Sequence, residues 1–91
     1  MRIAHNIHKS QKLIRIMLEY DEIQNTISRI LVSGDFFLYP EEALENLEAH
    51  LVGKKLERET LKQEIDSCLK GIEVYGFSST SLTEAIIGCK M

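Results

Sequence analysis

The sequence has few of the residues that mark specialised classes of protein. Of its 91 residues, two are cysteine, one is proline, none is tryptophan, and the five glycines occur singly. Dispersed glycines exclude the G-x-G-x-x-G and G-x-x-x-x-G-K-[ST] loops that hold nucleotide phosphates. The 44% content of hydrophobic residues and the modest net charge of −3 argue against a disordered chain. We therefore expect an ordered domain that binds no cofactor by itself.

Neither a basic cluster nor a long apolar run is present. Eleven basic residues are offset by fourteen acidic ones, and no cluster of Lys and Arg exceeds a pair, which argues against nucleic-acid binding. No apolar run approaches the roughly 20 residues that cross a bilayer. The first twelve residues are not followed by the apolar segment of a signal peptide. These features predict a soluble, cytoplasmic protein that binds neither nucleic acid nor membrane.

The metal-ligating residue types are too sparse to predict a metal site. Cys68 and Cys89 form neither a C-x-x-C motif nor any zinc-ligand spacing, and we interpret them as reduced, mostly buried thiols. A disulfide or a sulfur-handling cysteine is the alternative. His5 and His8 have no third ligand nearby and are interpreted as part of a solvated segment. His50 lies near a predicted helix end, where we expect a surface or capping role.

The length of the chain allows one domain. We divide it into an N-terminal arm of residues 1–11, flexible or forming a sheet edge, and a single domain of residues 12–91. The alternation of Ile14, Ile16 and Leu18 with half-polar residues predicts a strand over residues 12–20. A second, β-branched strand is expected over residues 26–33. The short polar segment between them predicts an antiparallel hairpin.

Three helices are expected to follow the hairpin. The first has Pro40 at its first position and Gly53 at its end, and the second runs over residues 57–70. The third begins near Ser81, where Ser-Leu-Thr-Glu has the form of a capping box. The predicted order β-β-α-α-α is typical of an α+β domain, in which the three helices pack on one face of a small antiparallel sheet.

No set of residues predicts catalysis. Cys68 lies on an apolar helix stripe, where a thiol is hard to ionise. The Ser/Thr run of residues 78–81 lies where a helix needs an N-terminal cap, and the acidic pair Glu41/Glu42 suits the first turn of a helix. We therefore assign no catalytic residue and expect that the chain is not an enzyme by itself.

One segment is better explained by binding. Residues 34–40 read Gly-Asp-Phe-Phe-Leu-Tyr-Pro and place three aromatic side chains between a strand and a helix. In an extended backbone Phe36 and Phe37 point to opposite sides, so that one fills the core while the other, with Tyr39, faces a partner. Burial of both is an equally weighted alternative. The candidate partner-interface residues are Gly34, Asp35, Phe36, Phe37 and Tyr39.

The order of these segments resembles the C-terminal domain of lipoate–protein ligases. The strand–turn–strand of residues 13–21 and 27–32, followed by Gly-Asp-Phe-Phe at residues 34–37, is similar to the family's GDFF segment. The helix with Leu-Glu-x-x-Leu and a closing glycine corresponds to residues 47–53, and the next helix to residues 61–69. The resemblance covers residues 12–88.

The resemblance implies a non-catalytic accessory subunit. The family's catalytic domain carries an Arg/Gly-rich segment for lipoate and ATP and an essential lysine, and this sequence has no counterpart of either. The implied partner is a separate catalytic subunit, of the archaeal two-component type, that holds ATP, Mg and lipoate. The implied role is in forming lipoyl-AMP, before the lipoyl group moves to a lysine of a lipoyl-acceptor protein.

Two other functions are weighed against this one. Small α+β domains also serve in sulfur transfer and iron–sulfur assembly, where Cys68 or Cys89 would have to be exposed and ionisable. The chain is also compatible with a general protein-binding module of another pathway.

Overall fold

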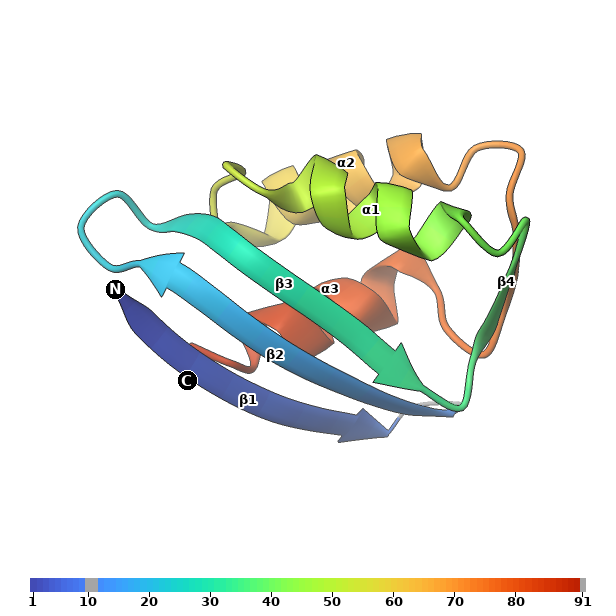
Figure 1. Ribbon diagram of the computed structural model, residues 1–91, viewed down its shortest axis with the longest axis horizontal. Helices are drawn as coiled ribbons and strands as arrows, with labels where there is room; N and C mark the ends of the chain where they lie inside the picture. The colour runs from blue at the N-terminus through green and yellow to red at the C-terminus, as the bar shows by residue number, and fades with distance from the viewer. Residues whose placement is uncertain (10–11, 91) are drawn as a thin grey trace.

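The computed structural model describes residues 1–9 and 12–90 and shows five strands and three helices (Figure 1). The strands are β1 (Arg2–Lys9), β2 (Leu13–Asp21), β3 (Thr26–Gly34), β4 (Phe37–Tyr39) and β5 (Glu73–Tyr75), and the helices are α1 (Ala43–Leu51), α2 (Arg58–Cys68) and α3 (Ser79–Ile87). Residues 10 and 11 of the expected arm and residue 91 of the expected domain lie outside the described residues.

The main sheet is antiparallel with the strand order β1-β2-β3. Its central strand β2 has the predicted alternation, because Ile14, Ile16 and Leu18 are buried between the sheet and the helices. The β2–β3 hairpin is also present, with a register shift between Glu19 and Tyr20. A second, two-stranded sheet pairs β4 with β5.

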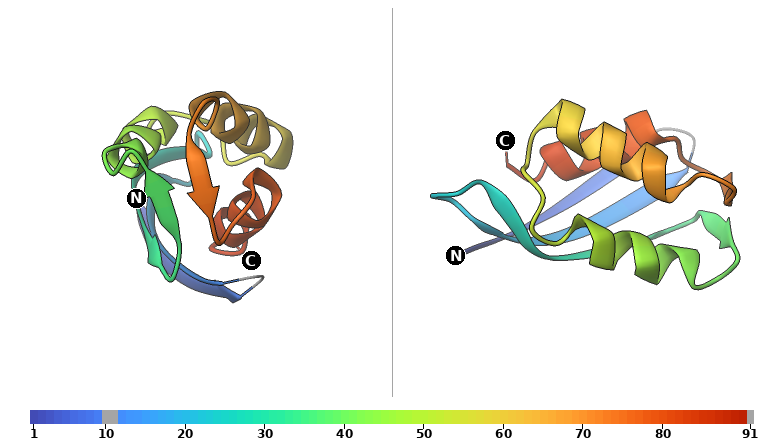
Figure 2. Two further views of the ribbon diagram at one scale, coloured as in Figure 1. Left: turned by 90° about the vertical axis from the view of Figure 1, so that its right-hand side faces the viewer. Right: turned by 90° about the horizontal axis from the view of Figure 1, so that it is seen from above.

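The three helices cover one face of the main sheet, as Figures 1 and 2 show. Their inward faces supply side chains that are fully buried, among them Leu47, Leu51, Leu61, Ile65, Leu82 and Ile86. This arrangement confirms the α+β class with three helices packed on a small antiparallel sheet. None of the helices described in residues 1–9 and 12–90 combines the length and the apolar character needed to span a bilayer.

The expected element order was incomplete, because it lacked β4 and β5 and left β1 as one of two alternatives, a flexible arm or a sheet edge. Residues 2–9 of the expected arm form the edge strand β1, paired along its length with β2. Only Ala4, Asn6 and His8 of β1 face the helices, and Asn6 Nδ2 donates a hydrogen bond to the Ala85 carbonyl at 2.8 Å. The isoleucines of β1 lie on the solvent side, so its core-facing positions do not show the alternation of apolar residues by which a strand is recognised in a sequence.

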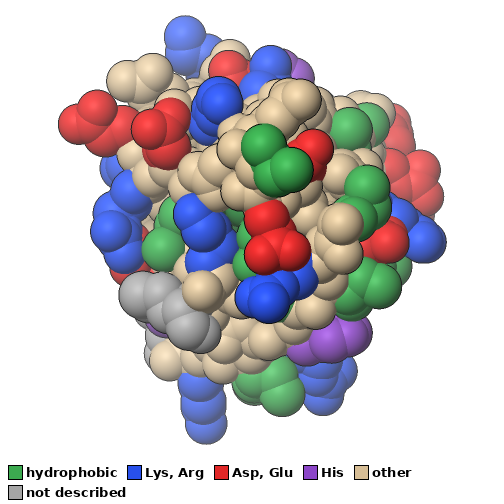
Figure 3. All heavy atoms as spheres, turned by 90° about the vertical axis from the view of Figure 1, so that its left-hand side faces the viewer, with side chains coloured by type: hydrophobic (Ala, Val, Ile, Leu, Met, Phe, Trp, Pro, Cys, Tyr) green, Lys and Arg blue, Asp and Glu red, His purple; other side chains and the backbone are tan. Residues whose placement is uncertain are grey.

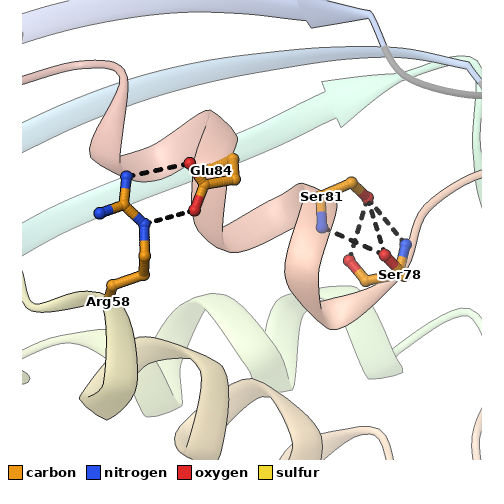
Figure 4. Close-up of polar contacts among 4 residues, drawn as sticks. All are labelled: Arg58, Ser78, Ser81 and Glu84. Atoms are coloured by element: carbon orange, nitrogen blue, oxygen red, sulfur yellow. Dashed lines mark hydrogen bonds and ion pairs between the residues drawn. The ribbon is translucent and has the colours of Figure 1, made fainter.

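The predicted helix starts were also wrong by up to one turn. Helix α1 begins at Ala43 instead of Pro40, because residues 41–42 form a turn in which the Ala43 N–H donates to the Pro40 carbonyl at 3.0 Å. Helix α3 begins at Ser79, with Ser78 as its N-cap. The capping box joins Ser78 to Ser81, each side-chain oxygen accepting the backbone N–H of the other (Figure 4).

Polar contacts tie the helices to one another. The Arg58 guanidinium on α2 donates to both carboxylate oxygens of Glu84 on α3 (Figure 4). His50 on α1 is not a helix cap but contacts Glu64 on α2, with 2.8 Å between Nε2 and Oε2. The side chains of these pairs are largely exposed to solvent, so each pair is expected to add little to the free energy of unfolding.

Candidate partner-binding surface

The short β4–β5 ribbon lies at one end of the molecule, beyond the end of β3 (Figures 1 and 2). Its antiparallel register places Phe37 opposite Tyr75, Leu38 opposite Val74 and Tyr39 opposite Glu73. The ribbon therefore brings the segment after the hairpin next to the segment between α2 and α3.

The ribbon has one apolar inner side and one aromatic outer side. Leu38 is buried, whereas 51% of Phe37, 61% of Tyr39 and 57% of Tyr75 is exposed. The Phe37 and Tyr75 rings are tilted against each other with their centroids 5.8 Å apart. We name Phe37, Tyr39 and Tyr75 the aromatic face. Exposed aromatic side chains held on a paired backbone are typical anchors of protein interfaces.

The two neighbouring phenylalanines lie on opposite sides of the chain. Phe36 is half-buried and packs edge-on against the buried Phe77, with 5.0 Å between ring centroids. Phe37 faces solvent. The structure thus places one ring against the core and the other on the aromatic face, as expected for neighbours in an extended segment.

Gly34 and Asp35 direct the chain from the main sheet into the ribbon. Gly34 has a φ of 148°, and a Cβ at this position would lie 2.0 Å from the Leu13 carbonyl oxygen. The Asp35 N–H donates to that same carbonyl at 3.0 Å, while its side chain is exposed. Gly34 therefore has a structural role in forming the surface.

Sequence reasoning missed Tyr75 and Glu73, which complete the outer side of the ribbon. The signal in the sequence was the β-forming pair Val74-Tyr75, which Gly76 separates from a further aromatic residue, Phe77. At the other end of the molecule, where the β2–β3 turn lies, acidic and basic side chains are interspersed (Figure 3). The two ends of the molecule thus differ in their exposed side chains, which are aromatic on the ribbon and largely charged near the β2–β3 turn.

The two cysteines are free, and neither resembles a reactive thiol. Burial raises the pKa of Cys89 to about 11, and its Sγ lies 3.8 Å from the Ala85 carbonyl oxygen. Burial is also the main cause that raises the pKa of Cys68, and Glu64 adds to it. A thiol with a raised pKa is a poor nucleophile near neutral pH because little thiolate forms.

No enclosed small-molecule site is found in residues 1–9 and 12–90, and these residues contain no group of three or more potential metal ligands. His5 and His8 both lie on β1, three positions apart, so their side chains point to opposite faces of the sheet. The structure therefore does not bring the two imidazoles together. The feature of the described surface best suited to binding is the aromatic face.

Together, these observations define a small α+β domain with an aromatic face at one end. The order of its segments is the one that resembles the C-terminal domain of lipoate–protein ligases. Sequence comparison confirms this resemblance. The chain is 38% identical over 58 residues to lipoate-protein ligase A subunit 2 of Thermoplasma acidophilum. That match covers 64% of this chain and 60% of the relative's own length. No family model matches the chain.

Structural comparison extends the likeness over nearly the whole fold. The chain superimposes with a TM-score of 0.82 and 29% identity on a chain from the structure of an archaeal lipoylation system. That structure comprises a bipartite lipoate protein ligase and its E2 lipoyl domain from T. acidophilum. The match covers 93% of this chain and 94% of the other, so it includes elements outside the sequence match.

Proposed function

We propose that this chain is the accessory subunit of a two-component lipoate–protein ligase and pairs with a separate catalytic subunit. The observation that carries the proposal is the match over 93% of this chain to a chain of the bipartite ligase system. The match also covers 94% of the other chain, so nearly all of that chain's fold has a counterpart in this one.

The proposed role is to enable the formation of lipoyl-AMP from lipoate and ATP. ATP, Mg and lipoate would be held by the catalytic subunit, and the lipoyl group would then move to a lysine of a lipoyl-acceptor protein. Lipoyl-AMP is a mixed anhydride that water hydrolyses, so a cover that excludes water from the active site serves the reaction directly. The cytoplasmic location expected from the sequence remains part of this proposal.

The aromatic face is the proposed contact with the catalytic subunit. Its three rings are exposed but held on a hydrogen-bonded ribbon, so little conformational entropy is lost when they are covered. Phe36 and Leu38 fix the ribbon to the core from behind. Rigid aromatic residues near the centre of an interface commonly supply most of its binding energy.

Reconstitution tests this function. Pyrophosphate release from ATP and lipoate would be measured for this chain alone, for the cognate catalytic subunit alone, and for their mixture. We expect release only from the mixture, followed by transfer to a lipoyl domain. The proposal fails if the catalytic subunit activates lipoate equally well alone, or if this chain turns over ATP unaided.

The sulfur-transfer alternative has less support. Persulfide chemistry needs an accessible thiolate, whereas Cys89 is buried and the pKa values of both thiols are raised.

A further inference from the structure

We propose that two copies of this chain pair edge to edge through β1, which joins their main sheets into one continuous antiparallel sheet. This surface is distinct from the aromatic face and does not depend on a catalytic subunit. The argument rests on the difference between the two edges of the main sheet and on the side-chain pattern of β1.

The β3 edge of the sheet is closed by the chain itself. The Glu48 carboxylate on α1 accepts a hydrogen bond from the Val32 N–H at 2.7 Å. Farther along, Ile27 N–H donates to the Lys54 carbonyl at 3.0 Å, and its carbonyl accepts from the Gly53 N–H at 2.7 Å. These contacts satisfy backbone groups that an edge strand otherwise leaves unpaired.

The β1 edge has no such cover among the described residues. In the strand order, β1 has β2 on one side and no strand on the other. It forms the lower boundary of the molecule in Figure 1. Eight residues of extended backbone, Arg2–Lys9, therefore present one row of donors and acceptors to solvent.

Two outward side chains of β1, Ile3 and Ile7, are apolar and lie symmetrically about His5. Ile3 is 62% exposed and Ile7 is 67% exposed, two positions to either side of His5 on the same face. When two antiparallel copies place His5 opposite His5, each Ile3 lies opposite the Ile7 of the other copy. Two aliphatic cross-strand pairs then form on one face of the joined sheet.

This self-matching pattern favours a second copy as the occupant. An interface around a twofold axis must be complementary to itself, and the Ile3–His5–Ile7 spacing meets that condition. The same register places Arg2 opposite His8, so within Arg2–Lys9 no Lys or Arg directly faces another. Arg2 is partly neutralised by Glu22, 3.4 Å away.

Analytical ultracentrifugation of the purified chain tests the proposal. We expect a reversible monomer–dimer equilibrium over a wide concentration range. Ile7→Lys should weaken the dimer at least about tenfold, because an ammonium group would face Ile3 across the pair. Ile3→Lys is the second variant, and circular dichroism verifies that both fold.

Ile23→Lys is the matched control, since Ile23 is 96% exposed in the β2–β3 turn and lies outside the proposed interface. It should leave the equilibrium unchanged. A chain that stays monomeric at every concentration overturns the proposal. So does a dimer that survives both folded lysine variants, or one that is lost in Phe37→Ala, which would place the contact on the aromatic face.

Discussion

Phe37 and Tyr75 are direct cross-strand partners whose ring centroids lie 5.8 Å apart, although helices α1 and α2 separate them in the chain. Each ring is more than half exposed. The pairing makes one continuous aromatic face from two distant segments. A partner that covers this face contacts both segments at once. A substitution in either segment should therefore change the affinity for that partner.

The first prediction concerns that affinity. Phe37→Ala and Tyr75→Ala should each raise the Kd for the catalytic subunit by roughly tenfold, as expected for an interface anchor that contributes about 1–2 kcal/mol. Isothermal titration calorimetry provides the measurement. Ile23→Ala removes an even more exposed apolar side chain elsewhere and should leave the Kd unchanged. Unchanged affinity in both aromatic variants would remove the ribbon from the interface.

The second prediction concerns the backbone turn that leads into the ribbon. Gly34→Ala should lower the free energy of unfolding by more than about 3 kcal/mol, because φ is unfavourable and the new Cβ would meet the Leu13 carbonyl oxygen. Gly53→Ala is the control, with a φ of 86° but open space around the new Cβ, and should cost about 1–2 kcal/mol. Urea unfolding separates the two, and equal losses would show that the carbonyl contact is unimportant.

The sequence predicted those parts of the fold that depend on local hydrophobic periodicity. Ile14, Ile16 and Leu18 revealed β2 because a strand covered on one face must alternate. The apolar stripes of α1 and α2, such as Leu47 and Leu51 on α1 and Leu61 and Ile65 on α2, revealed two helices in the same way. In each of these segments the local spacing of apolar residues is enough to predict the strand or helix.

The ribbon and β1 were not predictable on that basis. The pairing of Phe37 with Tyr75 depends on how α1 and α2 fold back, which no local pattern encodes. The hydrophobic residues Ile3 and Ile7 of β1 face away from the core, so the strand lacks an inward apolar period. Two of the three residues of the aromatic face, Phe37 and Tyr39, were therefore visible in residues 34–40, whereas the third, Tyr75, was not.

The third prediction concerns thiol reactivity. Because burial raises the pKa of Cys89 to about 11 from the ordinary 9.0, its thiolate fraction at about pH 8 is roughly a hundredfold smaller than that of an exposed cysteine. In the native protein iodoacetamide should label the half-buried Cys68 before Cys89, and in denaturant both equally. Mass spectrometry of the digested protein follows each site. Rapid native labelling of Cys89 would contradict this and revive the sulfur-transfer alternative.

The fourth prediction concerns pH. The hydrogen bond and charge of Arg58 lower the pKa of Glu84 below its ordinary value of 4.5. An acid with a lower pKa in the folded state stabilises the fold above its ordinary pKa, and this contribution is lost as the pH falls through the folded-state pKa. Glu84→Gln should therefore be less stable than the unsubstituted protein at neutral pH, and the difference should shrink in acid.

Urea unfolding at several pH values measures that difference. Both groups are exposed, so the effect is expected to be small, and added salt should reduce it further. Glu41→Gln is a control, because Glu41 forms no ion pair within the described part of the chain, and it should show no comparable pH dependence. A stability difference that is constant from neutral to acid pH would exclude the Arg58–Glu84 pair as its cause.

The last prediction concerns a buried hydroxyl on α3. Thr83 is 1% exposed, and its Oγ1 has no hydrogen-bond partner among the described residues. A buried hydroxyl without a partner loses its hydration and gains nothing in return, so an apolar side chain of the same shape is better suited to the site. Thr83→Val should raise the free energy of unfolding by about 1 kcal/mol.

The control is Thr80→Val on the same helix, where the side chain is exposed and the change in the free energy of unfolding should be near zero. Loss of stability in Thr83→Val would show that the hydroxyl has a partner in solution, such as a bound water molecule.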